Sequence, residues 1–329
     1  MCIRGESPVV FVSDFRGKIL VIRGGAIGDF ILTLPAITAL RTQFPDAHLE
    51  ILGYPHIIQL ALAGGIADRI QSIEARALAG FFARHGKLEE DLRDYFSEFD
   101  LIISYLYDPD EIFATNIRRC TPAQFVACPH RPDETADIHA TKVYLRPLER
   151  LAIFEADHIP RLTLCPQPPS LNPQPATPNQ LALHPGSGSE RKNWPEARWT
   201  DFLRYLVNST NLHLLLMGGE AEGERLQRLA ATLPPARTRV AQSLPLPELA
   251  RVLQRSKAFI GHDSGISHLA AALGLPGLVL WGDTHEAIWR PPSERVVVLR
   301  NPGGLDSLTV AAVVEHLQKL LPTIPREAK

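Results

Sequence analysis

The residues of this chain best suited to bind a ligand stand at 259–273, where an apolar strand should give way to a helix. Ser264, Gly265 and His268 follow that strand, and the first N–H groups of the helix would attract phosphate oxygens beside them. Asp263 in the same turn would repel phosphate, so we expect it to cap the helix or to accept from a hydroxyl or N–H group. The turn predicts a nucleotide-diphosphate site, with an ordinary Asp-capped helix as the alternative.

A second anion-binding pattern lies upstream, at residues 181–195. A short apolar strand leads into Gly186, Ser187 and Gly188, and Lys192 precedes a Trp-Pro pair at a helix start. Glycines let backbone amides approach an anion, serine adds a hydroxyl donor, and lysine adds a mobile positive charge. The segment therefore predicts a phosphate clamp. It lacks the Gly-Lys-Ser/Thr ending of a Walker loop, which argues against a P-loop NTPase.

A third pattern opens the globular part, at residues 18–41. An apolar run at 19–22 predicts a buried parallel strand, and apolar positions from 30 to 40 recur at helical spacing. Asp29 stands on the turn between them. It would act either as a helix N-cap or as a functional carboxylate at the end of a parallel strand, where open α/β sheets bind their ligands.

Strand-like and helical runs alternate on both sides of a proline-rich segment that can hold neither a helix nor a central strand. This alternation predicts an α/β fold class with two Rossmann-like domains facing across a cleft. We assign residues 1–165 to the first domain, 166–180 to an extended linker and 181–329 to the second domain. An amphipathic helix at 308–321 ends the second domain, and we expect it to pack back on the first. The predicted strands are 19–22, 48–52, 101–105, 181–184, 213–217, 258–260, 278–280 and 296–299, with helical stretches that include 35–43 and 142–152.

The composition limits the possible partners. The 329 residues are 45% hydrophobic and 21% charged, with a formal net charge of −2 at pH 7. This balance gives no reason to expect a nucleic-acid partner. No apolar run approaches the roughly 20 residues of a membrane helix, and the short run at 9–12 lacks a signal-peptide pattern. We therefore expect a cytoplasmic protein.

The three patterns, in their order along the chain, resemble glycosyltransferase family 9, the ADP-heptose:lipopolysaccharide heptosyltransferase group. Gly28-Asp29 is similar to the family's Gly-Asp turn, and Lys192-Asn-Trp-Pro195 to its Lys-x-Trp-Pro. Residues 263–269 are similar to its Asp-Thr-Gly-Leu-Ser-His-Leu, with Ser264 in place of threonine. Residues 137–144 also resemble its His-Ala-Val-x-x-Tyr stretch. The resemblance covers most of the chain and implies the two-domain architecture called GT-B.

The resemblance implies an inverting transfer that needs no metal and no bound cofactor beyond the donor substrate, expected to be ADP-heptose. Asp29 would take the acceptor proton. Lys192, with Ser187, Gly188, Ser264, Gly265 and His268, would hold the leaving diphosphate. Gly186 and Asp263 would belong to the same donor-binding site. A carboxylate after the strand at 213–217 would meet the ribose; we choose Glu222, with Glu220 and Glu224 as rivals and a solvated acidic turn as the alternative.

The resemblance makes the first domain the acceptor-binding one. We expect an anionic glycan or glycolipid such as lipopolysaccharide core, held by a cationic cluster, and contact with the inner membrane through that acceptor. The cluster comprises Arg118, Arg119, His130, Arg131, His139 and Lys142.

Alternatives remain open. Asp108-Pro-Asp110 could bind a divalent ion, although a turn with solvated charges is the simpler interpretation. Cys120, Cys128, His130 and His139 lack common zinc spacing, so free thiols are expected. A nicotinamide oxidoreductase would need a Gly-x-Gly-x-x-Gly turn, which residues 24–29 do not supply. A sugar-nucleotide epimerase or hydrolase, or a noncatalytic sugar-nucleotide-binding protein, would fit the same fold.

Overall fold

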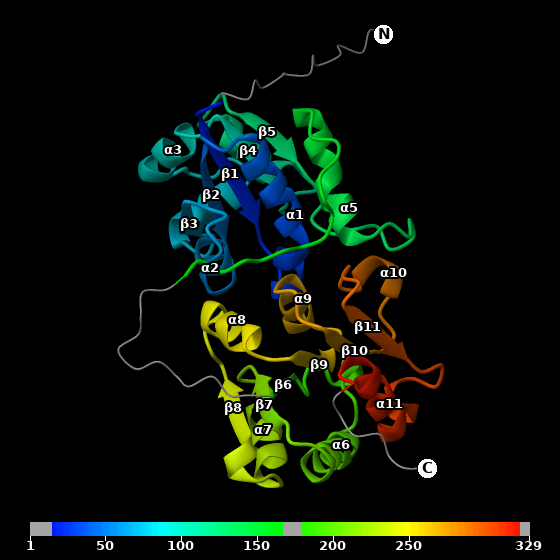
Figure 1. Cartoon of the computed structure of the whole chain (residues 1–329). Helices are drawn as coiled ribbons and strands as arrows, with labels where there is room; N and C mark the ends of the chain where they lie inside the picture. The colour runs from blue at the N-terminus through cyan, green and yellow to red at the C-terminus, as the bar shows by residue number, and fades with distance from the viewer. Residues whose placement is uncertain (1–14, 167–178, 323–329) are drawn as a thin grey trace. The chain divides into compact units, whose positions relative to one another are not determined.

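A computed structural model describes residues 15–166 and 179–322 of the chain (Figure 1). The chain forms two compact units, one ending at Pro160 and the other starting at Arg161. Most of the predicted linker, residues 167–178, lies outside the described residues, and its last residue, Gln180, opens the first strand of the second unit. Within the described residues, no helix is long and apolar enough to cross a membrane.

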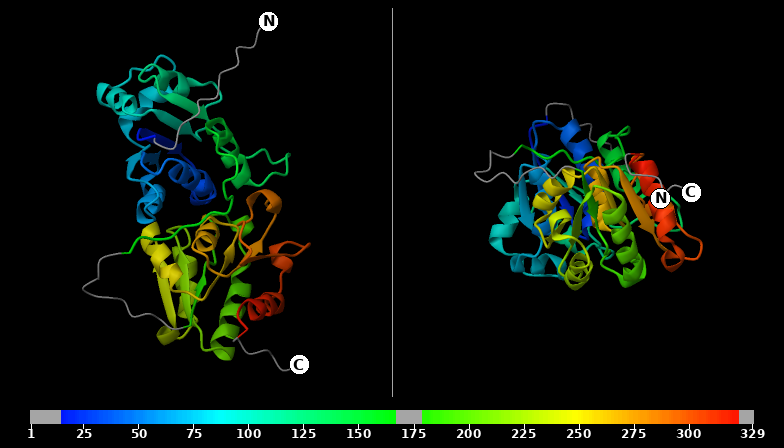
Figure 2. Two further views of the ribbon diagram at one scale, coloured as in Figure 1. Left: turned by 45° about the horizontal axis from the view of Figure 1, so that its top comes forward. Right: turned by 60° about the horizontal axis from the view of Figure 1, so that its bottom comes forward.

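The N-terminal unit is built on a five-stranded parallel sheet in the order β3-β2-β1-β4-β5. Residues 19–22 in β1 are fully buried, which explains why this strand is a continuous apolar run and not an alternating one. The helix α1 is buried along most of its length and packs against α5 (Figures 1 and 2). The elements of this unit are β1 Lys18–Arg23, α1 Ile27–Gln43, β2 His48–Gly53, α2 Pro55–Ala63, β3 Arg69–Ser72, η1 Arg76–Phe82, α3 Glu90–Ser97, β4 Leu101–Ser104, α4 Ile112–Arg118, β5 Gln124–Ala127, α5 Ala140–Leu145 and η2 Arg146–Leu151.

The C-terminal unit is built on a six-stranded parallel sheet in the order β11-β10-β9-β6-β7-β8. Its core contains Trp194, Trp199 and Phe202, packed with apolar residues of the sheet. The elements of this unit are β6 Gln180–Leu183, η3 Glu190–Lys192, α6 Glu196–Ser209, β7 His213–Gly218, α7 Gly223–Ala231, η4 Pro235–Arg237, β8 Thr238–Gln242, α8 Leu246–Gln254, β9 Ala258–His262, α9 Gly265–Ala272, β10 Gly277–Trp281, α10 Glu286–Trp289, β11 Val296–Arg300, η5 Leu305–Ser307 and α11 Val310–Leu320.

Each sheet has a point where the strand order reverses. In the first sheet it lies between β1 and β4, and in the second between β6 and β9. Connections leave to opposite sides there, so the carboxyl ends of the two strands border a crevice in which doubly wound folds bind ligands. The α/β class with two Rossmann-like domains is therefore confirmed, and the topology marks one candidate site in each unit.

One local prediction was wrong. The helix expected at 142–152 is α5 followed by the 3₁₀ helix η2, because Pro147 cannot donate the hydrogen bond that an α-helix needs there. The terminal helix α11 packs on α6 and β10 of its own unit, and Val313, Val314 and Leu317 complete that unit's core (Figure 2). Its expected contact with the first domain stays a prediction.

Candidate functional site

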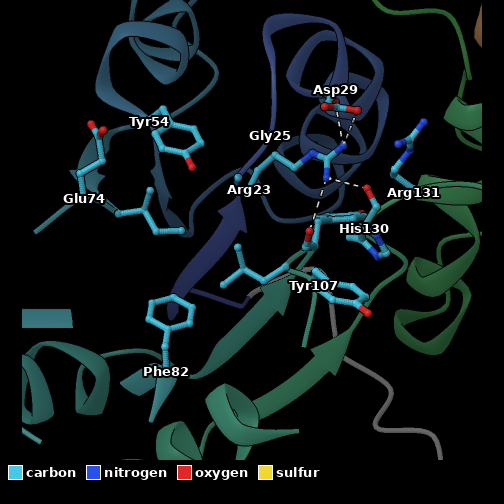
Figure 3. A pocket seen from close by; sticks show the side chains of 13 residues that line it. Arg23, Gly25, Asp29, Tyr54, Glu74, Phe82, Tyr107, His130 and Arg131 are labelled. Atoms are coloured by element: carbon cyan, nitrogen blue, oxygen red, sulfur yellow. Dashed lines mark hydrogen bonds and ion pairs between the residues drawn. The ribbon is translucent and has the colours of Figure 1, made fainter. Parts of the chain in front are cut away.

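A pocket of about 600 Å³ opens at the reversal point of the first sheet (Figure 3). The ends of β1 and β4, the start of α1 and the loop after β5 all contribute to it. The lining residues are Arg23, Gly24, Gly25, Asp29, Tyr54, Ile73, Glu74, Phe82, Tyr105, Leu106, Tyr107, His130 and Arg131.

Asp29 lies in the first turn of α1, but it is the third helical residue and Ala26 is the N-cap. Its Oδ2 atom accepts from the backbone N–H of Ala26 at 2.9 Å, and its Oδ1 atom lies 3.6 Å from Nη2 of Arg23. The backbone of Gly25 has a φ of 97°, and a Cβ there would lie 2.8 Å from Oδ2. Glycine thus allows the turn to hold the carboxylate, which is fixed in orientation and still lines the pocket.

Figure 3 draws Arg23, His130 and Arg131 on the same side of the pocket as the Asp29 carboxylate, and Tyr54 and Glu74 on the other side. Burial, followed by the charges of Arg23 and Arg131, lowers the pKa of His130, while Asp29 opposes the shift. The His130 imidazole is therefore neutral near pH 7, and its ring centroid lies 4.6 Å from that of Tyr107. A carboxylate, an imidazole and the Arg131 guanidinium, flanked by exposed aromatic rings, can bind a polar ring-shaped molecule and accept a proton from it.

The two predicted phosphate segments meet at the reversal point of the second sheet. Nζ of Lys192 lies 2.6 Å from Oδ2 of Asp263, and the aspartate side chain is 8% exposed. Ser264, not Asp263, is the N-cap of α9 and accepts from the Ser267 N–H. Of the two roles expected for Asp263, the structure has the second, because its carboxylate accepts from the N–H groups of the Lys192 ammonium. The reason is geometric: Asp263 directly follows β9 and its side chain meets the lysine from the neighbouring loop. His268 is buried on α9.

Two buried histidines join these segments, and the sequence reasoning did not select them. Nε2 of His262 accepts from the backbone N–H of Trp194 at 2.8 Å, and its Nδ1 lies 3.2 Å from the carbonyl oxygen of Gly186. Nδ1 of His184 lies 3.2 Å from the Ser264 hydroxyl. Burial lowers the pKa of His184 to about 4 and that of His262 to about 3, so both are neutral. Their positions at the ends of two strands were the signal that could have identified them.

Glu222 fastens two loops of the C-terminal unit together. Its Oε1 accepts from the Gly188 N–H at 3.1 Å and its Oε2 from the Gly219 N–H at 2.8 Å. A Cβ on Gly186 would lie 2.2 Å from Cγ of Glu222, so glycine is required for this approach. The Gly188 N–H, expected at a phosphate, thus meets a carboxylate here. Ser187 also faces its own loop, since its hydroxyl lies 2.7 Å from Oδ1 of Asn193.

The three candidate ribose carboxylates occupy different surroundings. Glu222 lines a pocket of about 300 Å³ together with Gly188, whereas Glu220 lines a separate, more open pocket of about 530 Å³. Glu224 lines both and forms a 3.6 Å ion pair with Arg228. Glu222 alone of the three is hydrogen-bonded to the predicted phosphate loop.

The predicted cationic cluster is divided among several places. His130 and Arg131 line the 600 Å³ pocket, but Arg118 lies over the Phe125 ring and Arg119 donates to Asn116. The expectation of one cluster was wrong because these residues belong to separate helices and loops of the unit. The remaining two members are His139, which caps α5, and Lys142, which lines a separate cavity of about 330 Å³.

The Asp108-Pro-Asp110 pair has structural partners. Asp108 accepts from the N–H groups of Phe113 and Ala114 at the start of α4, and Asp110 lies 3.4 Å from Arg84. Cys120, Cys128 and Cys165 are free thiols. Across residues 15–166 and 179–322, no group of three or more His, Cys, Asp and Glu residues is arranged to hold a metal ion.

This chain is similar to known proteins in sequence and in fold. Residues 155–309 match the sequence model of glycosyltransferase family 9 (heptosyltransferase). Lipopolysaccharide heptosyltransferase 3 of Escherichia coli is 23% identical over 341 residues, which cover 90% of this chain and 97% of that protein. The solved structure of E. coli ADP-heptose lipopolysaccharide heptosyltransferase II has a TM-score of 0.74 at 18% identity, covering 93% of this chain and 98% of that one. An E. coli heptosyltransferase solved with ADP has a TM-score of 0.70 at 21% identity, covering 92% and 99%.

The family match and the heptosyltransferase relatives together identify this chain as a glycosyltransferase. The family that the chain resembles is glycosyltransferase family 9, and the resemblance predicted from its three motifs is confirmed.

Proposed function

We propose that this chain transfers a heptose from ADP-heptose to a hydroxyl group of a glycan or glycolipid such as lipopolysaccharide core, with inversion and without a metal ion. The names of its relatives support the sugar and the acceptor class. The observation that carries the proposal is the Asp29 carboxylate, which is held by the Ala26 N–H and Arg23 at the edge of a pocket large enough for a sugar.

The N-terminal pocket is proposed to bind the acceptor. Asp29 takes the proton of the acceptor hydroxyl as its oxygen attacks the anomeric carbon. The neutral His130 and the cation of Arg131 would bind polar or anionic groups of the acceptor, and Tyr107 would pack on a sugar face. The bond from the anomeric carbon to the acceptor oxygen forms as the bond to the phosphate oxygen breaks.

The C-terminal unit is proposed to bind the donor. The Lys192 ammonium group forms an ion pair with Asp263. A diphosphate bound at the start of α9 would interact with the same ammonium group. Backbone N–H groups near Ser264 and Gly265 would receive the remaining negative charge. The leaving ADP is stabilised by these groups as its charge develops. Glu222 is proposed at the ribose, with Gly186, Ser187, Gly188 and His268 shaping the site.

The acceptor also determines where the protein works. We propose a cytoplasmic location, with contact to the cytoplasmic face of the inner membrane through a glycolipid acceptor. The proposed domain roles follow the motifs, with acceptor binding in the N-terminal unit and donor binding in the C-terminal unit.

The test is ADP release from ADP-heptose in the presence and absence of a panel of lipopolysaccharide-core acceptors, with product analysis by mass spectrometry. Transfer predicts ADP release that requires an acceptor, and product whose anomeric configuration is inverted. Release without acceptor would indicate a hydrolase, and isomerised donor an epimerase. Donor binding without any turnover across the panel would indicate a sugar-nucleotide-binding protein.

A further inference from the structure

Arg23, the last residue of β1, holds a buried positive charge beneath the acceptor pocket. Its side chain is 2% exposed, whereas that of Asp29 is 25% exposed. A buried charge is costly unless it is well paired, yet the nearest carboxylate oxygen of Asp29 lies 3.6 Å away. The Nε atom of Arg23 is also buried and has no hydrogen-bond partner among the described residues. The chain therefore tolerates an incompletely satisfied guanidinium at this point.

The guanidinium is held by groups from four different parts of the N-terminal unit. Nη1 donates to the carbonyl oxygens of His130 at 3.0 Å and Tyr105 at 3.4 Å. The Tyr144 ring, from α5, has its centroid 4.8 Å from the guanidinium carbon, and the Tyr105 ring lies at 5.8 Å. Because backbone carbonyls and aromatic rings carry no formal charge, they hold the guanidinium in place without neutralising its positive charge. That charge can therefore act on an anionic group that lines the pocket.

That charge is directed at one residue. Nη2 of Arg23 donates to the backbone carbonyl of Asp29 at 3.3 Å, and the same atom lies 3.6 Å from Oδ1 of Asp29 (Figure 3). The Ala26 N–H holds the other carboxylate oxygen. Two fixed groups thus define the orientation of the Asp29 carboxylate. If Arg23 were replaced by lysine or methionine, the forked pair of N–H donors of the guanidinium would be lost.

We propose that Arg23 is a positioning residue that acts through Asp29: it fixes the carboxylate in the orientation that accepts the acceptor proton. This inference rests on the proposed function, since it requires Asp29 to be the base. A purely structural role is the competing account, because Arg23, at the end of β1, also contacts the end of β4, the loop after β5, α1 and α5. The two accounts differ in whether substitution of Arg23 lowers kcat further once Asp29 has been replaced.

The experiment is a double-mutant cycle with Arg23→Met, Arg23→Lys and Asp29→Asn, using ADP release in the presence of acceptor. Arg23→Met should lower kcat by about 10- to 100-fold, the order of loss that follows misplacement of a reacting group, and leave ADP affinity by calorimetry unchanged. Arg23→Lys should retain part of kcat because it keeps the charge. The double variant Arg23→Met/Asp29→Asn should be no slower than Asp29→Asn alone.

Arg41→Met is the matched control. Arg41 is a partly buried arginine of the same unit that donates to the carbonyl oxygen of Ala47 and pairs with Asp68, but it does not line the pocket. It should lose stability without a specific loss of kcat. Circular dichroism melting gives the folded fraction, and if Arg23→Met is unfolded the same cycle is run with Arg23→Lys.

The outcomes separate the two proposals. If Asp29→Asn turns over normally, the proposed base is wrong and this inference falls with it. If Asp29→Asn is slow but folded Arg23 variants are normal, only the Arg23 inference is overturned. Losses that multiply in the double variant, or an equal loss of kcat in Arg41→Met, would assign Arg23 a structural role.

Discussion

Acidification should destabilise the C-terminal unit through His184 and His262. Burial holds the pKa of the first at about 4 and that of the second at about 3, against an ordinary value of 6.5. Both rings are neutral in the folded protein at pH 5, whereas the unfolded chain would bind a proton at each. Since the unfolded state binds more protons in this range, the free energy of unfolding falls as pH falls below 6.5, and continues to fall until each folded pKa is reached.

The magnitude follows from the pH interval. One pH unit between the two pKa values corresponds to about 1.4 kcal/mol for each histidine. From pH 7.5 to pH 5.0, each ring should therefore remove about 2 kcal/mol, and the pair about 4 kcal/mol. Carboxylates with depressed pKa values, such as Glu196, contribute mainly below this window, because their unfolded pKa is 4.5. The interval from pH 7.5 to 5.0 thus isolates the histidine effect.

Tryptophan fluorescence can report on this unit alone. All four tryptophans, Trp194, Trp199, Trp281 and Trp289, belong to the C-terminal unit. Urea unfolding followed by fluorescence at pH 7.5 and 5.0 gives the two free energies of unfolding. His262→Gln removes one titrating group and should halve the loss on acidification, whatever its effect at pH 7.5. His316→Gln, at a half-buried position on α11, controls for the substitution itself.

The reasoning would be refuted by a loss below about 1 kcal/mol in the unchanged protein between these pH values. It would also be refuted if His262→Gln showed the full loss. In either case the two imidazole rings would be protonated or hydrated in the folded state. The neutral His262 ring would then not connect the Trp194 N–H to the Gly186 carbonyl oxygen as described.

Three further predictions address the proposed chemistry. Asp29→Asn should keep the bond to the Ala26 N–H and most of the ADP affinity while lowering kcat by about 10²- to 10⁴-fold in the ADP-release assay; near-normal turnover would leave Asp29 as a helix-start residue only. Lys192→Ala should weaken ADP binding far more than adenosine binding in calorimetry. Lys319→Ala on α11 is the control, and equal weakening of both ligands would point to a folding defect. Transfer should continue in EDTA at the rate seen without it; activity lost in chelator and restored by magnesium or manganese would return Asp108 and Asp110 to consideration.

The central strands and the strand-to-helix turns could be predicted from the sequence because each is encoded by a short continuous run of residues. A strand buried on both faces is a continuous apolar run, as at residues 19–22, and a strand-to-helix turn rich in glycine and serine can be recognised without its neighbours. The strands that were missed, β3, β5 and β8, lie at sheet edges and are short or partly exposed. An edge strand such as Arg69–Ser72 has no apolar run to detect.

Local patterns were sufficient to predict the fold class and the family resemblance, and they marked the strand ends at which the candidate sites are proposed. Which side chains contact one another became known from the three-dimensional fold. Lys192 pairs with Asp263 because β6 and β9 are neighbours in the sheet, and Arg23 reaches His130 because β1, β4 and β5 are adjacent. These partners are 71 and 107 residues apart in the chain. Strand order is fixed by the packing of the whole unit, so no local pattern could have specified such pairs.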